Sequence, residues 1–535
     1  MLFPTSKIAS RCASFIREHD RDNVSAGLKI IHLVLDTANP SSAALRPLSP
    51  TISAVIYAAE AFPYAKQYWQ HSGDGVSSRR AEFCHGLFRD GLLVLDERPR
   101  SPVSHDQKPC RGPRRYQRPL SLDHAVSQVP KSSVAPSQKA DAREAQETSR
   151  FLEERFGRNL DISFVEPAKS AIRRRIAGAL KGELDFEATP LPEMVPNSRG
   201  FANLEEDDVT LYPCGMNAIF NAHRYLLDAR GPMRSINFGF PYVDTLKILQ
   251  KFGPGCEFYG HASESDLDEL EKRLEGGERF LGLFCEFPGN PLLTCPNLVR
   301  IRQLADKYDF AVVVDETIGT FANVNVLQYA DIVVSSLTKI FSGDCNVMGG
   351  SAILNPNSRY YASLKAAVGR EYEDTYWAED VVFMERNSRD FASRIDRINT
   401  NAEAICDVLL ASPLTRALYY PKHNASRPNY DICKLPNSGY GGLLSVTFHH
   451  REQAITFYDA LETAKGPSLG TNFTLTSPYA ILAHYQELEW ARGFGVDPDL
   501  VRISVGLEET DQLKAVFENA LKAAEERTGQ TSEAA

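Results

Sequence analysis

The chain is predicted to be an α/β protein with a largely parallel sheet, because two patterns alternate through its central part. Runs that are apolar at almost every position occur at 280–287 (FLGLFCEF), 310–316 (FAVVVDE) and 330–337 (ADIVVSSL). Stretches with helical spacing of apolar residues separate such runs, for example 297–309 (NLVRIRQLADKYD). Strands buried on both faces that alternate with amphipathic helices are typical of βαβ units, in which consecutive strands run parallel.

The length of the chain and its local amino-acid composition predict several regions. At 535 residues the chain is longer than one hydrophobic core usually organises. We expect an N-terminal extension over 1–95, a flexible linker rich in Pro, Ser, Arg and Lys over 96–150, and an N-terminal arm of the catalytic unit over 151–200. The large α/β domain is expected over 201–365, and a smaller C-terminal α+β domain over 366–535.

Charge, hydropathy and cysteine usage exclude several classes of function. The net charge of −10 argues against a nucleic-acid partner, which normally meets a basic surface. No run approaches the roughly 18 apolar residues that span a bilayer, so no membrane association is expected. The ten cysteines lack a CxxC pair or zinc spacing, which predicts reduced thiols and no metal site. We expect a cytoplasmic protein; a mitochondrial presequence is the alternative, because Lys7, Arg11 and Arg17 precede the first acidic residue.

Lys339 is the first candidate catalytic residue, because it follows the buried run 330–337. A lysine at the end of a buried strand is costly, since its charge loses water. The same desolvation lowers the pKa and yields a nucleophilic amine. From this segment alone, a surface lysine just beyond a strand is an equal alternative. The neighbours Ser336 and Thr338 carry hydroxyls that suit phosphate oxygens.

Asp315 is the second candidate, because it stands at the carboxyl end of another apolar run. Open α/β sheets bind their ligands at this end of the strands. A lone buried acid there is often a helix cap or a metal ligand instead. Asp315 lies 24 residues before Lys339, with one strand–loop–strand connection between them. This spacing favours neighbouring strands that present both groups at one edge of the sheet.

The third candidate is a phosphate-binding helix that begins near Gly215 and Met216. The apolar run DVTLYP precedes them, and the helical stretch GMNAIFNAHRYLLDAR follows. Free N–H groups at a helix start bind phosphate through hydrogen bonds and through the helix dipole. Taken alone, this pattern is more often an ordinary turn from strand to helix.

In chain order, the phosphate-binding helix, Asp315 and Lys339 together resemble the fold-type I enzymes that use pyridoxal phosphate (PLP). Five motifs resemble those of the trans-sulfuration family of Cys/Met metabolism. They are S-x-T-K at 336–339, E-x-P-x-N-P at 286–291, D-x-T at 315–317, S-L-G at 468–470 and R-x-S-V-G-x-E at 502–508. Five ordered motifs between residues 286 and 508 leave little room for coincidence.

The resemblance implies a fold and a branch of the family. It covers roughly 151–535 and implies a large domain with a mostly parallel seven-stranded sheet, together with the smaller C-terminal domain. The amino-acid sequence is most similar to the fungal cystathionine γ-synthase branch, as in the segments FGFPYVDTLKI and ETAKGPSLGTNFTL. The block WQHSGDGVSSRRAEFC also resembles that branch, which implies that 1–95 is an extension of it.

The resemblance also implies roles for single residues. Lys339 would hold PLP as a Schiff base and would later shuttle protons. Asp315 would pair with the pyridine nitrogen, so that the ring acts as an electron sink. Tyr242 would stack on the ring and would assist Lys339 in catalysis. It stands in YVDT, where Y-G-G-T is usual in the family. The further implied cofactor contacts are Gly215, Met216, Ser336, Thr338, Thr317, Asn290 and Arg158. Arg502, Ser468 and Asn290 would bind the substrate, with Arg502 clamping its α-carboxylate.

Several positions depart from the family pattern. Cys214 stands where a serine often helps to hold the phosphate, and a thiol is a weak donor. The loop GDCN replaces the usual G-H-S-D after the lysine. Phe156-Gly157-Arg158 is the best counterpart of a Tyr-x-Arg that reaches the phosphate from a neighbouring subunit. The resemblance therefore implies a homodimer or homotetramer, unless Arg158 serves its own subunit.

The resemblance implies γ-replacement in methionine biosynthesis, in which an O-acylhomoserine and L-cysteine give cystathionine. Three alternatives stay open at this point. A cystathionine lyase has the same motifs, and so does an enzyme of specialised metabolism that adds another nucleophile to a vinylglycine intermediate derived from O-acetylhomoserine. A non-catalytic regulatory protein is the remote alternative.

Overall fold

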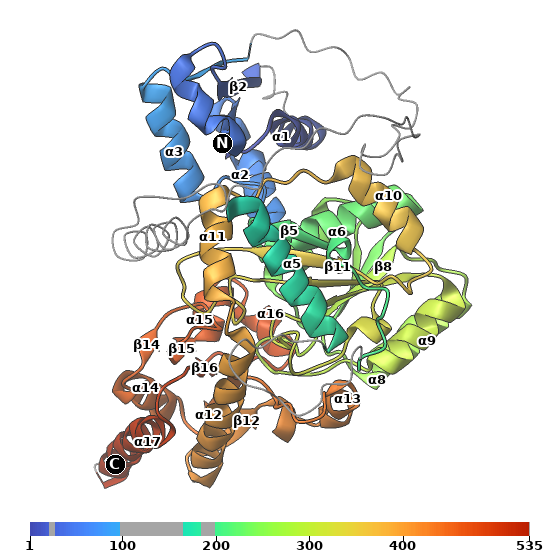
Figure 1. Cartoon of the computed structure of the whole chain (residues 1–535). Coiled ribbons are helices and arrows are strands. Elements are labelled where there is room, and N and C mark those ends of the chain that lie inside the picture. The colour runs from blue at the N-terminus through green and yellow to red at the C-terminus, as the bar shows by residue number, and fades with distance from the viewer. Residues whose placement is uncertain (21–26, 97–163, 183–197, 534–535) are drawn as a thin grey trace, which may run out of the picture.

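The structure is a computed structural model that describes residues 1–20, 27–96, 164–182 and 198–533. It contains three sheets, of four, seven and five strands in chain order. In Figure 1 the N-terminal part (blue) and the C-terminal part (orange to red) lie at opposite ends, with the central sheet between them. Among the described residues, no helix combines the length and the apolar character that a membrane crossing requires.

The seven-stranded sheet has the order β5-β11-β10-β9-β8-β6-β7. Neighbours from β10 to β7 pair in parallel, and only β11 runs antiparallel to the strands on its two sides. The prediction of a mostly parallel seven-stranded sheet is therefore confirmed. The strands are β5 (Val209–Tyr212), β6 (Ser235–Phe238), β7 (Cys256–Tyr259), β8 (Gly282–Glu286), β9 (Ala311–Asp315), β10 (Ile332–Ser335) and β11 (Gly350–Leu354).

The apolar runs seen in the sequence form strands because both faces of this sheet are buried. On β9, Val312 and Val314 belong to one hydrophobic cluster, and Ala311 and Val313 belong to another on the opposite face. This alternation with period two is the geometry of a strand covered on both sides. The covering helices are α5 (Val165–Lys181), α6 (Gly215–Arg230), α7 (Val243–Lys251), α8 (Glu264–Glu275), α9 (Leu298–Tyr308), α10 (Tyr361–Glu371) and α11 (Ala378–Asn387).

Strand register brings the candidate residues to one edge of the sheet. Glu286 at the end of β8 is opposite Asp315 at the end of β9. Asp315 in turn is opposite Val334 on β10, whose chain continues directly into the turn that carries Lys339. Because these strands are parallel, all three deliver their next residues to the same edge.

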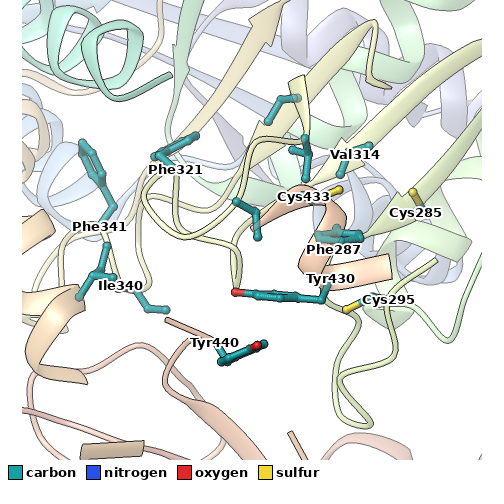
Figure 2. Packing of buried hydrophobic residues seen from close by; sticks show 14 of the residues in the cluster. Cys285, Phe287, Cys295, Val314, Phe321, Ile340, Phe341, Tyr430, Cys433 and Tyr440 are labelled. Atoms are coloured by element: carbon teal, nitrogen blue, oxygen red, sulfur yellow. The ribbon is translucent and has the colours of Figure 1, made fainter. Parts of the chain in front are cut away.

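The C-terminal part is a five-stranded sheet of order β12-β13-β16-β15-β14 with helices packed on it. Figure 2 shows one place where it meets the central part. Phe287, directly after β8, stacks on Tyr430 at 5.9 Å between ring centroids, and Tyr430 stacks on Tyr440 at 5.1 Å. The elements are α12 (Phe391–Ala411), β12 (Thr415–Tyr419), α13 (Arg427–Cys433), β13 (Leu443–Phe448), α14 (Arg451–Ala460), β14 (Ala464–Lys465), β15 (Leu475–Pro478), α15 (Tyr479–His484), α16 (Leu488–Gly493), β16 (Val501–Ser504) and α17 (Thr510–Glu533).

The N-terminal part is a four-stranded antiparallel sheet of order β1-β3-β2-β4 with three α-helices. Its elements are β1 (Leu2–Phe3), α1 (Ser6–His19), β2 (Lys29–Leu35), β3 (Thr51–Ile56), α2 (Phe62–Ser72), α3 (Ser78–Arg89) and β4 (Leu93–Leu95). We call it the N-terminal domain. The linker predicted over 96–150 lies almost entirely outside the described residues, as does much of the predicted arm.

The N-terminal domain shares a hydrophobic core with the central sheet. Phe15 and Tyr68 belong to the same cluster as Phe220 on α6. Phe252, at the end of α7, lies 4.9 Å from the ring of Phe15 and 5.0 Å from the ring of Phe220. Aromatic pairs at these distances add to the stability gained from burial. The same side chains that hold α6 on the sheet therefore also hold the N-terminal domain.

We expect Phe220→Ala to lower the free energy of unfolding by about 3–5 kcal/mol, because the side chain is 2% exposed and its removal leaves a cavity. The urea midpoint, followed by tryptophan fluorescence, measures this loss. Phe88→Ala is the control, since Phe88 is 55% exposed and its loss should change stability by less than about 0.5 kcal/mol. Equal midpoints for the two variants would contradict the shared core.

Candidate active site

A cavity of about 500 Å³ opens at the carboxyl edge of the central sheet. Asp315, Ser468 and Arg502 lie next to it and hydrogen-bond to residues that line it. Arg158 lies outside the described residues. The lining includes Gly215, Met216, Tyr242, Asn290, Thr317, Ser336, Thr338 and Lys339. The structure thus brings together every described residue that the sequence singled out.

One wall of the cavity is the first turn of α6. The helix begins at Gly215, and Cys214 at its N-cap makes no side-chain capping hydrogen bond. A Cβ on Gly215 would lie 2.6 Å from the Cβ of Ser336. Only glycine therefore lets the helix start approach the turn after β10. A helix start beside hydroxyl side chains is a favourable site for a phosphate group.

Thr317 links the acid on β9 to the turn that precedes Lys339. Oδ1 of Asp315 accepts hydrogen bonds from the N–H and the Oγ1 of Thr317, at 2.9 and 2.6 Å. The same Oγ1 accepts a hydrogen bond from the N–H of Ser336 at 2.8 Å. Burial raises the pKa of Asp315, and the hydrogen bonds from Thr317 act in the opposite direction. These contacts fix the carboxylate at the strand end.

Glu286 is a second acid beside Asp315, and the sequence analysis gave it no role of its own. Burial, and then the charge of Asp315, raise the pKa of Glu286 to about 8. Its carboxylate accepts hydrogen bonds from the backbone N–H groups of Tyr242 and Asn290. Glu286 therefore holds the backbone at two positions that line the cavity. Glu286 is the first residue of the E-x-P-x-N-P motif, and this position in the motif could have identified it.

Lys339 points its amine toward the C-terminal part. Its Nζ donates a hydrogen bond to Oγ of Ser468 at 2.8 Å. Burial, and then the charge of Arg502, lower the pKa of Lys339 to about 8. The loop of Ser468 approaches closely because Gly470 has φ +75°, and a Cβ there would lie 2.5 Å from the backbone nitrogen of Ile340. The glycine of S-L-G is thus needed for the contact between the loop and Lys339.

Arg502 is buried and hydrogen-bonds to Asn290 and to the loop that contains Ser468. Its guanidinium donates to Oδ1 of Asn290 at 3.1 Å and to the carbonyl oxygens of Pro467 and Ser468 at 2.6 and 2.8 Å. It lies 4.5 Å from the ring centre of Tyr479, whose hydroxyl accepts a hydrogen bond from Asn290. Burial lowers the pKa of Arg502 to about 10, so the group stays cationic at neutral pH. Sequence reasoning missed Tyr479, because no motif includes it.

Tyr242 borders the cavity at the start of α7, where it is the N-cap residue and is 44% exposed. The sequence also missed a group from the N-terminal domain that lines the same cavity. Its members are Trp69, Gln70, Gly73, Gly75 and Val76. They belong to the block WQHSGDGVSSRRAEFC, which resembles the fungal branch of the family but contains no motif that indicates a binding site.

These groups fit PLP. A half-buried lysine with a lowered pKa suits a covalent bond to the cofactor aldehyde. A positively charged ring nitrogen beside Asp315 would offset the cost of ionising this buried acid. The close approach of α6 and the turn at Ser336 leaves backbone N–H and hydroxyl groups at one end of the cavity. The sites for amine, ring nitrogen and phosphate therefore lie at one edge.

Comparison with known proteins agrees with this arrangement. Residues 198–522 match the family of Cys/Met metabolism PLP-dependent enzymes, and residues 1–77 match the N-terminal domain of fungal trans-sulfuration enzymes. A cystathionine gamma-synthase of Neurospora crassa is 65% identical over 99% of this chain and 87% of its own length. The cystathionine gamma-synthase-like enzyme iboG2 of Amanita muscaria is 43% identical over 99% and 86%, respectively.

Solved structures share the fold at low sequence identity. A cystathionine gamma synthase from Xanthomonas oryzae pv. oryzae is 20% identical with a TM-score of 0.53, covering 67% of this chain and 98% of that chain. A cystathionine gamma-lyase from Lactobacillus plantarum is 21% identical with a TM-score of 0.50, covering 59% and 82%, respectively. The predicted fold type I is confirmed. The chain is a PLP-dependent enzyme and belongs to the Cys/Met metabolism family.

Proposed function

We propose that the enzyme catalyses γ-replacement, in which an O-acylhomoserine and L-cysteine give cystathionine and a carboxylic acid. The observation that carries this proposal is that the Lys339 amine and the Arg502 guanidinium both donate hydrogen bonds to Ser468, in one loop beside the cavity. The 65% identity to the cystathionine gamma-synthase of Neurospora crassa supports the choice of reaction. PLP, when bound, supplies an electron sink for negative charge at the substrate Cα.

The residues of the sheet edge would hold the cofactor. Lys339 binds it covalently, and Asp315 pairs with the ring nitrogen. Thr317 holds Asp315 in place through its two hydrogen bonds. Tyr242 would pack on the ring. Gly215, Met216, Ser336 and Thr338, which line the cavity, would hold the phosphate.

Lys339 would also move the protons of the reaction. With the substrate in the site, its Nζ would accept the proton from Cα and would later return a proton to the substrate. A pKa near 8 leaves a useful fraction of the amine neutral at neutral pH. The hydrogen bond to Ser468 orients Nζ between proton transfers. The thiol of L-cysteine then adds at Cγ after the acyl group has left.

Arg502 and Asn290 would orient the substrate. The guanidinium forms a charge-assisted pair with the α-carboxylate and so fixes Cα relative to Lys339. Asn290 hydrogen-bonds to both Arg502 and Tyr479, which holds the amide in one orientation. The proposal includes a homodimer or homotetramer, with Arg158 completing the phosphate site of a second chain, and a cytoplasmic location.

The reaction is tested by incubation with O-acetyl- or O-succinylhomoserine, with and without L-cysteine, followed by identification of the products. We expect cystathionine only when both substrates are present, and Lys339→Ala should abolish it without loss of the fold. Release of 2-oxobutanoate as the main product in the presence of cysteine would instead assign elimination. Retained turnover in Lys339→Ala would contradict the role of the amine.

The lowered pKa of Lys339 predicts the pH dependence of cofactor uptake by the apoprotein. Only the neutral amine attacks an aldehyde, so the rate should rise about tenfold per pH unit below pH 8 and level off above it. Stopped-flow absorbance measures the rate, and borohydride reduction with peptide mapping places the adduct. An ordinary lysine would give a rate that keeps rising toward pH 10, and this outcome would refute a desolvated Lys339.

Arg502→Lys should weaken the substrate clamp, because an ammonium cannot replace the two-pronged guanidinium. We expect kcat/KM for the O-acylhomoserine to fall about tenfold to hundredfold, which corresponds to about 1.4–3 kcal/mol. The change should lie mostly in KM for this substrate. Steady-state kinetics at saturating cysteine measure it, and an unchanged KM would place the carboxylate elsewhere.

A further inference from the structure

The cavity that contains Lys339 has walls from two ends of the molecule. Leu469 of the C-terminal part lines it, and so do Trp69 and Val76 of the N-terminal domain. These parts lie at opposite ends in Figure 1. In the Xanthomonas oryzae structure, 98% of the chain corresponds to 67% of this one, so about a third of this chain has no counterpart there. The wall formed by the N-terminal domain lies outside residues 198–522, which match the Cys/Met metabolism family, and within residues 1–77, which match the N-terminal domain of fungal trans-sulfuration enzymes.

The segment 69–76 is held firmly on the first turn of α6. The side-chain amide of Asn217 donates to the carbonyl oxygen of Ser72 at 2.9 Å and to Oδ1 of Asp74 at 2.8 Å. Gly73 has φ +65°, and a Cβ there would lie 2.7 Å from the backbone nitrogen of Asn217. The thiol of Cys214 donates to the carbonyl oxygen of Gly73 at 3.7 Å. The segment therefore packs directly against the helix start.

A second contact ties this segment to α7. His71 and Asp244 form a buried pair, with Nδ1 and Oδ1 at 2.7 Å, and Nζ of Lys251 lies 3.2 Å from Nε2 of His71. Asp244 also lines the cavity, two residues after Tyr242. Asp244 stands in YVDT, at a position where the family usually has glycine. The residue that departs from the family pattern is therefore the one that pairs with His71 of the N-terminal domain.

Trp69 is the largest side chain that the N-terminal domain contributes to the cavity lining. A Cβ on Gly75 would lie 2.4 Å from Nε1 of Trp69, so the indole is packed directly on the backbone of that glycine. The side chain is nevertheless 45% exposed, and Met348 in the same lining is 53% exposed. Exposed apolar side chains that gather at a concave site are typical of ligand contacts.

We propose that the N-terminal domain completes the substrate cavity and that Trp69 contacts the acyl arm of the O-acylhomoserine. This inference rests on the proposed function. With its α-carboxylate at Arg502, on the C-terminal side of the cavity, the substrate extends toward the wall formed by the N-terminal domain. An uncharged ester arm suits the apolar surface of Trp69, Val76 and Met348. Trp69 then acts as a specificity-determining residue, and His71 and Asp244 act as positioning residues for its segment.

The test compares Trp69→Ala and Trp69→Phe with Phe88→Ala, an exposed aromatic of the same domain outside the cavity lining. In the holoenzyme, Trp69→Ala should raise KM for O-acetylhomoserine about fivefold to twentyfold, with KM for cysteine and kcat within about threefold of wild type. Trp69→Phe should restore most of the loss, and Phe88→Ala should cause none. Unchanged KM values in Trp69→Ala would overturn the proposal.

A binding measurement separates this proposal from the proposed reaction. In the Lys339→Ala background, calorimetry with O-acetylhomoserine should give a Kd that Trp69→Ala weakens by about the same factor, without any turnover. If wild type makes no cystathionine but Trp69→Ala still weakens this binding, the reaction is wrong and the contact stands. Equal Kd values for Trp69→Ala and Phe88→Ala, with melting temperatures like that of the parent, would overturn the contact itself.

Discussion

The parallel register of β8, β9 and β10 is the constraint on which the site depends. It sets Glu286 opposite Asp315 and Asp315 opposite Val334, so three successive strands end at one level. The polar groups delivered there are at least half-buried, and each needs a hydrogen-bond partner. Thr317 provides that partner for Asp315 and at the same time holds the turn at Ser336. The hydrogen bonds of Thr317 therefore fix both the carboxylate of Asp315 and the turn at Ser336.

Lys339 and Arg502 both contact the loop of Ser468, and the positive charge of Arg502 disfavours protonation of the Lys339 amine. Arg502 lowers the pKa of Lys339, in addition to the effect of burial. An anionic carboxylate on Arg502 would cancel this repulsion, so the amine would become a stronger base after the substrate has arrived. In the proposed reaction, substrate binding and the basicity of Lys339 would thereby be coupled, at the loop of Ser468 that contacts both side chains.

The sequence predicts the parts of this architecture that leave a local pattern. The apolar runs before Asp315 and Lys339 indicate strands buried on both faces, and their ends indicate one edge of the sheet. Tyr479 and Trp69 leave no such pattern, because their contacts join residues far apart in the chain. Trp69 lies 270 residues from Lys339, and a hydrophobic period carries no information over that distance. Glu286 stands between these cases: its motif is visible, but its place beside Asp315 follows only from strand register.

The shared core of α6 has a consequence for shortened forms of this enzyme. Phe220 and its neighbours in that core face Phe15 and Tyr68 of the N-terminal domain. A polypeptide that lacked its first 96 residues would present these aromatic rings to water, next to the helix start that borders the cavity. An apolar patch of that kind promotes self-association. Such a fragment would be expected to aggregate even though its PLP-binding sequence was intact.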